Sequence, residues 1–81
     1  MVPISFDDYI RKHRIANPDD DITQVKRSLR QAVLDKQNGA KCHCGRPIWA
    51  IGSALLYMAC FTCLTGEADS SKDYEIDEVC W

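Results

Sequence analysis

The 81-residue chain has few aromatic side chains, 9% of the total, and no apolar run long enough to span a membrane. Its longest apolar stretch covers residues 48–61 and is interrupted at Gly52 and Ser53. A transmembrane helix needs about 20 consecutive apolar residues. The first residues also lack the basic leader and apolar segment of a secretory signal. These absences predict a cytoplasmic protein that makes no membrane contact.

An excess of positive charge is missing as well, because 12 acidic side chains outnumber 10 basic ones and give a formal net charge of −2. The charge is unevenly spread. Residues 1–46 hold nine basic and six acidic side chains, whereas residues 47–81 hold one basic and six acidic. A protein with this balance is not a general binder of polyanions, so any nucleic-acid contact is expected to use the N-terminal half.

What the chain does have is cysteine, five residues in 81, together with a globular composition of 46% hydrophobic and 27% charged residues. Residues 1–81 are expected to form a single domain, and a domain this short buries only about 60% of the surface of its unfolded chain. Such a core is marginal and favours an additional cross-link. Thiols stay reduced in the cytosol, and an odd number of cysteines does not close into disulfides, so the pattern indicates metal binding.

Residues 1–39 predict two helices. Ser5 is a suitable N-cap for the first, and Pro18 disfavours helical geometry at Asn17, so this helix should end by Ala16. The second helix begins either at Asn17, with Pro18 in its first turn, or at Asp21, with Gln24 three residues later. Its apolar positions form one stripe at helical spacing: Ile22, Val25, Leu29, Ala32 and Val33.

Gly39 is a natural stop for the second helix. Because the link between the helices is short, the two are expected to pair as an antiparallel helical hairpin. His13 falls on the apolar face of the first helix and is expected to be packed against the protein rather than to bind a metal.

After Gly39 the pattern changes to one typical of strands. Residues 47–51 and 54–59 flank Gly52-Ser53 and predict strand, turn and strand. An alternative is a helix over 53–60, because Ala, Leu and Met favour helices. Residues 66–73 are expected to be a polar loop, after which Tyr74, Ile76 and Val79 are candidates for a last short strand.

The cysteines form two close pairs. Cys42 and Cys44 are one residue apart, Cys60 and Cys63 are two residues apart, and 15 residues separate the pairs. A spacer of two strands and a turn would return the second pair beside the first. Four thiolates suit a tetrahedral divalent ion, with Zn²⁺ as the first expectation and iron as the alternative. The glycines after each pair, Gly45 and Gly66, are expected to turn the backbone so that its amides point at the sulfurs.

Over residues 41–66 this pattern resembles the zinc-ribbon and rubredoxin-knuckle superfamily. The resemblance implies that the metal ligands are Cys42, Cys44, Cys60 and Cys63. The first pair departs from the superfamily pattern, which usually has two residues between the cysteines. His43 and Cys80 are therefore alternative ligands. The fold expected is α+β, with the helical hairpin of residues 1–39 followed by a zinc-ribbon-like β-hairpin module over residues 40–81.

Four protein ligands leave a tetrahedral ion no open position, so the sequence predicts a structural metal and no enzyme activity. The leading interpretation is a non-catalytic accessory module that binds an unidentified protein partner. One alternative is a nucleic-acid-binding regulator whose basic helix contacts phosphates, and another is a rubredoxin-like electron-transfer protein with iron. The basic candidates for phosphate contacts are Lys26, Arg27, Arg30, Lys41 and Arg46. The aromatic candidates for base stacking are Trp49, Tyr57 and Phe61, which in a domain this small are expected to be core residues instead.

Overall fold

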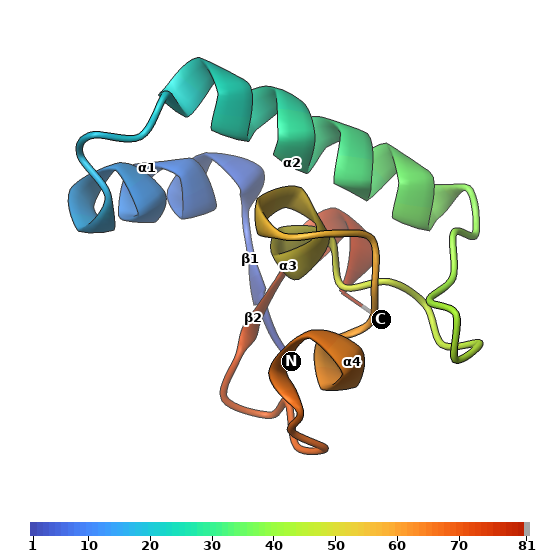
Figure 1. The fold of residues 1–81 in the computed structure, drawn as a ribbon. Helices are drawn as coiled ribbons and strands as arrows, with labels where there is room; N and C mark the ends of the chain where they lie inside the picture. The colour runs from blue at the N-terminus through green and yellow to red at the C-terminus, as the bar shows by residue number, and fades with distance from the viewer. Residues whose placement is uncertain (81) are drawn as a thin grey trace.

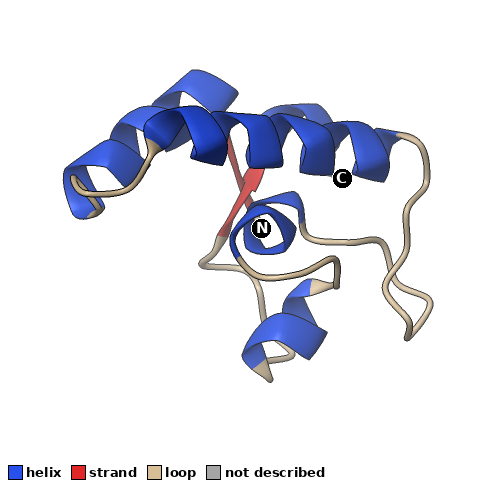
Figure 2. Ribbon diagram, turned by 45° about the horizontal axis from the view of Figure 1, so that its top comes forward, coloured by secondary structure: helices blue, strands red, loops and turns tan. Residues whose placement is uncertain are grey.

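A computed structural model describes residues 1–80, and within them the fold mixes α-helices with a pair of short strands. In both views of the ribbon, helix α3 lies between α2 and α4 (Figure 1, Figure 2). No helix of the described residues has the length and apolar character that crossing a membrane requires. The elements follow in this order: β1 (Val2–Ile4), α1 (Phe6–Ala16), α2 (Ile22–Gln37), α3 (Ala50–Leu55), α4 (Phe61–Thr65), β2 (Tyr74–Ile76) and the 3₁₀ helix η1 (Asp77–Val79).

Helices α1 and α2 occupy the predicted ranges because their ends are set by local side chains. Ser5 accepts a hydrogen bond from the backbone N–H of Asp8 and caps α1. Of the two possible starts for α2, the structure has Asp21, whose carboxylate accepts from the N–H groups of Thr23 and Gln24. Gly39, with φ of +87°, follows the end of α2 as expected. The two helices run in opposite directions along the molecule (Figure 1).

His13 is packed against the protein, as predicted, with 7% of its surface exposed. Its Nε2 lies 2.9 Å from Oδ2 of Asp20, which belongs to the link between α1 and α2. Its Nδ1 lies 3.5 Å from the hydroxyl of Tyr9. The histidine therefore ties α1 to the link that follows it.

The strands join the two ends of the described chain. β1 and β2 pair in parallel, with Val2 opposite Tyr74 and Ile4 opposite Ile76. The prediction of a last strand is confirmed for Tyr74–Ile76, whereas Val79 belongs to η1 and is fully buried. The partner strand β1 was not predicted, because three residues are too short to show a strand period.

The predicted β-hairpin over residues 47–59 is wrong, because residues 50–55 form helix α3. The reason lies far away in the sequence: the carboxylate of Glu75 accepts hydrogen bonds from the N–H groups of Ala50 (2.8 Å) and Ile51 (3.4 Å). Those amides are among the donors that a helix start leaves without partners, so Glu75 stabilises this start from β2. Gly52 lies inside the helix, where a side chain would collide with the ring of Trp49 and with Leu64.

The main apolar cluster holds α1, α2, α3, β2 and η1 together. Glu75 is fully buried beside it and forms an ion pair of 2.9 Å with Lys36, which is 7% exposed. That pair connects the last turn of α2 with β2 and the start of α3. The buried members of the main apolar cluster are Ile10, Leu29, Ala32, Val33, Ala50, Ile51, Ile76 and Val79.

Candidate metal centre

The first two cysteines lie in a tight loop, residues 41–47, here called the first cysteine loop. Lys41 and Pro47 form an antiparallel bridge at its base, and the N–H of Cys42 donates to the carbonyl of Arg46 at 2.7 Å. Gly45 has φ of +93° and donates its N–H to the carbonyl of Cys42 at 2.9 Å. The turn at Gly45 is as predicted, but its amide binds this carbonyl and not a sulfur.

The second pair begins helix α4. Cys60 is the N-cap, and its Sγ accepts from the N–H of Cys63 at 3.5 Å. Gly66 ends the helix with φ of +78°, and its N–H donates to the carbonyl of Thr62, again not to a sulfur. Cys60 and Cys63 thus flank the first turn of α4, and residues 60–66 are here called the second cysteine segment.

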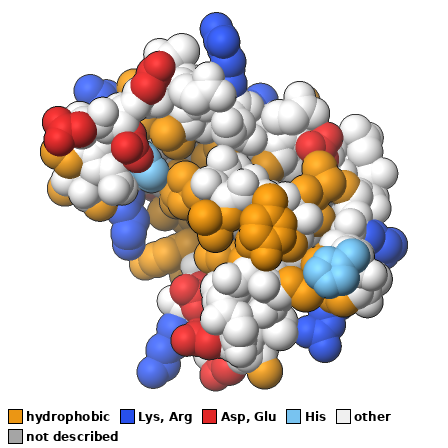
Figure 3. All heavy atoms as spheres, viewed as in Figure 1, with side chains coloured by type: hydrophobic (Ala, Val, Ile, Leu, Met, Phe, Trp, Pro, Cys, Tyr) orange, Lys and Arg blue, Asp and Glu red, His pale blue; other side chains and the backbone are white. Residues whose placement is uncertain are grey.

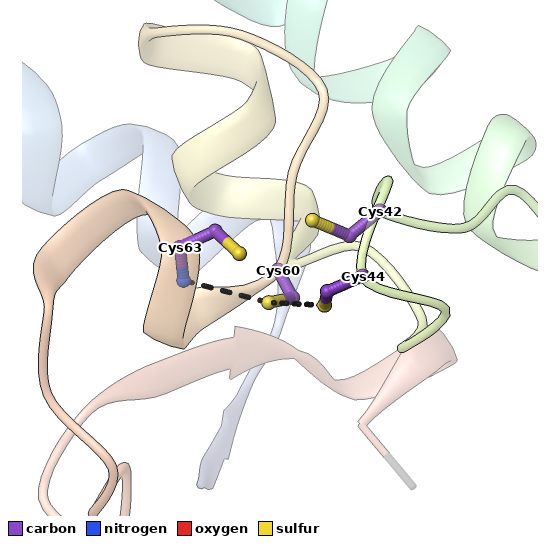
Figure 4. Close-up of side chains that lie close together, drawn as sticks. All are labelled: Cys42, Cys44, Cys60 and Cys63. Carbon is purple, nitrogen blue, oxygen red and sulfur yellow. Dashed lines mark hydrogen bonds between the residues drawn. The ribbon is translucent and has the colours of Figure 1, made fainter.

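The two segments bring all four sulfurs together. The Sγ atoms of Cys42, Cys44, Cys60 and Cys63 lie within 4.8 Å of one another and point toward a common centre (Figure 4). The Sγ atoms of Cys44 and Cys60 are 3.6 Å apart. A tetrahedral zinc ion with Zn–S bonds of about 2.3 Å sets its sulfurs about 3.8 Å apart, so the cluster is close to the size such an ion needs.

Contacts outside the sulfurs also link the two segments. The guanidinium of Arg46 donates to the hydroxyl of Thr62 at 3.3 Å, which joins the first cysteine loop to α4.

Ala59 lies next to the second pair, and its carbonyl accepts from the N–H of Trp49 at 2.9 Å. The ring of Trp49 packs edge-on against Phe61 at 5.0 Å, and its Nε1 donates to the carbonyl of Tyr74. The cysteine cluster is therefore attached to α3 and β2.

Hydrogen bonds within the cluster shift the pKa values of two cysteines, Cys42 and Cys63, in opposite directions. Hydrogen bonds from the backbone amides of Cys44 and Cys60 lower the pKa of Cys42 to about 6. The thiol of Cys63 makes hydrogen bonds to the sulfurs of Cys42 and Cys60, and these bonds raise the pKa of Cys63 to about 12. These contacts therefore favour the thiolate form at Cys42 and the protonated form at Cys63.

The four ligand candidates differ in exposure. Cys42 and Cys60 are each 4% exposed, Cys63 is half-buried, and Cys44 is exposed. One edge of the cluster therefore faces solvent and the opposite side is closed by protein.

The two alternative ligands lie outside the cluster. His43 is exposed, and its Nδ1 lies 3.6 Å from the Sγ of Cys42, but it is not part of the group of converging ligand atoms. The Sγ of Cys80 contacts the carbonyl of Met1 at 3.7 Å instead. Among the described residues the converging group consists of the four cysteines alone.

The sequence did not predict an exposed run of apolar residues that starts at the last residue of α3 and continues toward α4, here called the apolar loop. Its members are exposed by between 48% and 68%, although the predicted strand would have buried half of them. The run does not alternate between polar and apolar residues, which was the available signal against a strand with one face in solvent. Hydrophobic side chains gather near the middle of the face shown in Figure 3. The apolar loop consists of Leu55, Leu56, Tyr57 and Met58.

The aromatic and basic candidates have separate places. Trp49 and Phe61 pack against each other, as expected of core residues, whereas Tyr57 is 59% exposed, which corrects its expected place in the core.

Arg30 stacks on the ring of Phe6 and pairs with Glu78 at 3.4 Å. Four of the five basic candidates stay exposed without an ion pair among the described residues: Lys26, Arg27, Lys41 and Arg46.

Comparisons with protein-family models, with characterised proteins and with solved structures give no match. The geometry therefore stands by itself: four cysteines lie close enough together to hold one metal ion, in keeping with a small metal-binding module.

Proposed function

We propose that this chain is a non-catalytic zinc-binding module that works by contacting another protein. The observation that carries the metal part is the convergence of four sulfurs within 4.8 Å of one another. Thiolate sulfur is a preferred ligand of Zn²⁺, and a Cys₄ set fills the tetrahedron of a structural ion. The role of the ion is to hold the first cysteine loop and the second cysteine segment together, because these segments bury little apolar surface between them.

A structural role is favoured over catalysis because all four ligand positions are taken by protein. Substrate or water would have to displace a cysteine before it reached the ion. Iron fits the same four sulfurs, and electron transfer would follow from it. The identity of the bound metal distinguishes a structural zinc site from an electron-transfer site, because a zinc protein is colourless, whereas an iron–thiolate centre absorbs visible light.

The apolar loop supports the protein-binding part. Ser53 holds its ends, because the hydroxyl of this residue donates to the carbonyl of Ala59 and accepts from the N–H of Ala59, both at 3.2 Å. These two hydrogen bonds hold Ser53 and Ala59 together, and the four exposed apolar side chains lie in the chain segment between these residues. Contiguous exposed apolar residues are unusual on a protein that works alone. Arg30 is already engaged within the chain, which leaves the nucleic-acid interpretation with less support.

Native mass spectrometry of the full chain tests the metal part. We expect one zinc ion per chain, lost together with native structure when a chelator is added. A chain that binds no metal, or that keeps its full native spectrum after chelation, would remove the basis of the proposal. Visible absorption with bound iron would favour electron transfer instead.

Capture from native extract with the zinc-loaded chain tests the partner. A protein retained by the wild type should be lost with Leu56→Asp, which places a charge in the apolar loop. Ile15→Asp is the matched control, because Ile15 is 79% exposed on α1 and is not a member of that loop. Equal capture by both variants would contradict the surface assigned, and retention of nucleic acid that falls steeply with salt would favour the regulator.

A further inference from the structure

The four cysteines of the metal centre differ in how far each residue is exposed to solvent, and this difference decides where a dissolved oxidant reacts first. Cys44 is exposed, whereas Cys42 and Cys60 are each 4% exposed and Cys63 is half-buried. Oxidation of cysteine follows thiolate character and exposure. Metal ligation supplies the thiolate at all four positions, so exposure singles out Cys44.

The sulfur of Cys60 lies close enough to that of Cys44 to react next. Its Sγ lies 3.6 Å from that of Cys44, and a disulfide bond is about 2.05 Å long, so a small approach joins them. Cys60 is held as the N-cap of α4, whereas Cys44 lies beside Gly45 in an exposed turn. The approach is therefore expected to come from Cys44.

We propose that the metal centre is a peroxide-sensitive switch: Cys44 and Cys60 form a disulfide and the metal ion is released. This inference rests on the proposed metal-binding function and names how that site is regulated. The oxidant is a hydroperoxide, and a thiol reductant restores the site.

The chemistry balances in two steps. The thiolate of Cys44 attacks one peroxide oxygen, the O–O bond breaks, and Cys44 becomes a sulfenic acid while the other oxygen takes up a proton and leaves as an alcohol, or as water from hydrogen peroxide. The thiolate of Cys60 then attacks the sulfur of Cys44, and hydroxide leaves and is protonated to water. Two thiolates, one hydroperoxide and two protons thus give one disulfide, one alcohol and one water.

The disulfide removes two of the four ligands. Cys42 and Cys63 remain, and two thiolates do not complete the coordination of a structural zinc ion. Cys60 is also the neighbour of Ala59, whose carbonyl and N–H anchor the end of the apolar loop through Ser53. Oxidation at the cluster therefore acts on the surface proposed to contact a partner.

Hydrogen peroxide, added in steps to the zinc-loaded full chain, tests the switch. Released zinc is measured with a chromogenic chelator, and the disulfide is identified by mass spectrometry of proteolytic peptides. We expect one zinc ion released per disulfide, peptides containing Cys44 and Cys60 linked to each other, and recovery of zinc binding after dithiothreitol and zinc are added.

Two variants sharpen the result. Cys80→Ser removes the thiol outside the cluster and should leave the release rate unchanged. Cys44→Ser should abolish the disulfide at Cys60. If that variant fails to take up zinc, the peptide map of the wild type still identifies the linked pair.

The outcomes separate this inference from the proposed function. Zinc that is bound but retained at peroxide concentrations that oxidise free cysteine overturns the switch alone. Release with a disulfide between other cysteines, or with no disulfide, overturns the assigned pair. A chain that binds no zinc ends both proposals.

Discussion

Residues 1–80 contain two clusters of buried residues that are held together by different physical means. The main apolar cluster packs aliphatic side chains from α1, α2, α3, β2 and η1. The cysteine cluster buries only Cys42, Ala59 and Cys60, with Cys63 and Leu64 packed against them. Burial of aliphatic carbon is a non-directional force that grows with area, so the first cluster is stable by packing. The second has little such area and depends on directed bonds.

This difference assigns separate roles to the two parts. The main apolar cluster places α3 and β2, and through Trp49 it fixes where the cysteine cluster is attached. The cysteine cluster then holds the first cysteine loop and α4, which have few other contacts with the core. The metal ion is proposed to supply the missing stability, and structural zinc in small peptides contributes about 10–16 kcal/mol.

Loss of the metal is expected to have the largest effect. Cys60→Ser removes a proposed metal ligand while the serine hydroxyl can still cap α4, so the first cysteine loop and the second cysteine segment should lose their structure and the thermal transition should fall steeply. Hydrogen exchange followed by mass spectrometry, together with a thermal melt, measures both. Cys80→Ser is the control and should stay folded. If the two variants tolerate heating equally, the assignment of the ligands is wrong.

The next largest effect is expected at the buried ion pair of the main apolar cluster. Glu75→Gln leaves the ammonium of Lys36 without its carboxylate and weakens the cap of α3, and breaking a buried pair costs about 3–5 kcal/mol. Urea denaturation measures the loss. Glu78→Gln at the half-exposed pair with Arg30 should cost less than about 1 kcal/mol. Similar losses for both variants would show that burial of Glu75 does not matter.

A smaller effect is expected where the two clusters meet. Gly52→Ala places a methyl group against the ring of Trp49 and against Leu64, and crowding of this kind costs about 1–3 kcal/mol. The free energy of unfolding should fall in urea. Adding Leu64→Ala to this variant should recover part of the loss, since it removes one of the crowded partners. A stabilised Gly52→Ala protein would show that α3 moves freely at this contact.

The smallest expected effect is on the number of protons that the chain releases when zinc binds. If the site is formed before the metal binds, Cys42, with its pKa lowered to about 6, is already a thiolate at pH 7.5, whereas Cys63, raised to about 12, must still lose its proton. Zinc binding should then release one proton fewer at pH 7.5 than at pH 5. Calorimetry in buffers of different ionisation enthalpy counts these protons. Equal counts at both pH values would show that the metal-free cluster is not formed.

If the site is formed before the metal binds, the same shifts predict how the stability of the metal-free chain depends on pH. The lowered pKa of Cys42 adds stability that is complete above its ordinary value of 9.0 and is lost as the pH falls through about 6. The raised pKa of Cys63 adds stability below 9.0 that is lost as the pH rises through about 12. Chemical denaturation of the metal-free chain across this range checks both directions.

The parts of the fold that the sequence predicts correctly are those with local causes. Ser5, Asp21 and Gly39 mark the ends of α1 and α2 through contacts within a few residues. The two close pairs of cysteines are read directly from their spacing, but the spacer that brings the pairs together contains helix α3 and not the predicted two strands and a turn. The predicted β-hairpin is wrong because α3 begins where the carboxylate of Glu75 meets it, and Glu75 lies 25 residues from Ala50. No local pattern contains that contact.

The amino-acid sequence alone determined two helices with their caps and four thiols at ligand spacing, because each depends on neighbours along the chain. Only the tertiary structure decided that residues 50–55 are helical, that Cys44 is the most exposed of the four clustered cysteines and that Leu55 to Met58 face solvent. These features depend on which distant groups lie nearby, and burial and long-range hydrogen bonds exist only once the chain has folded.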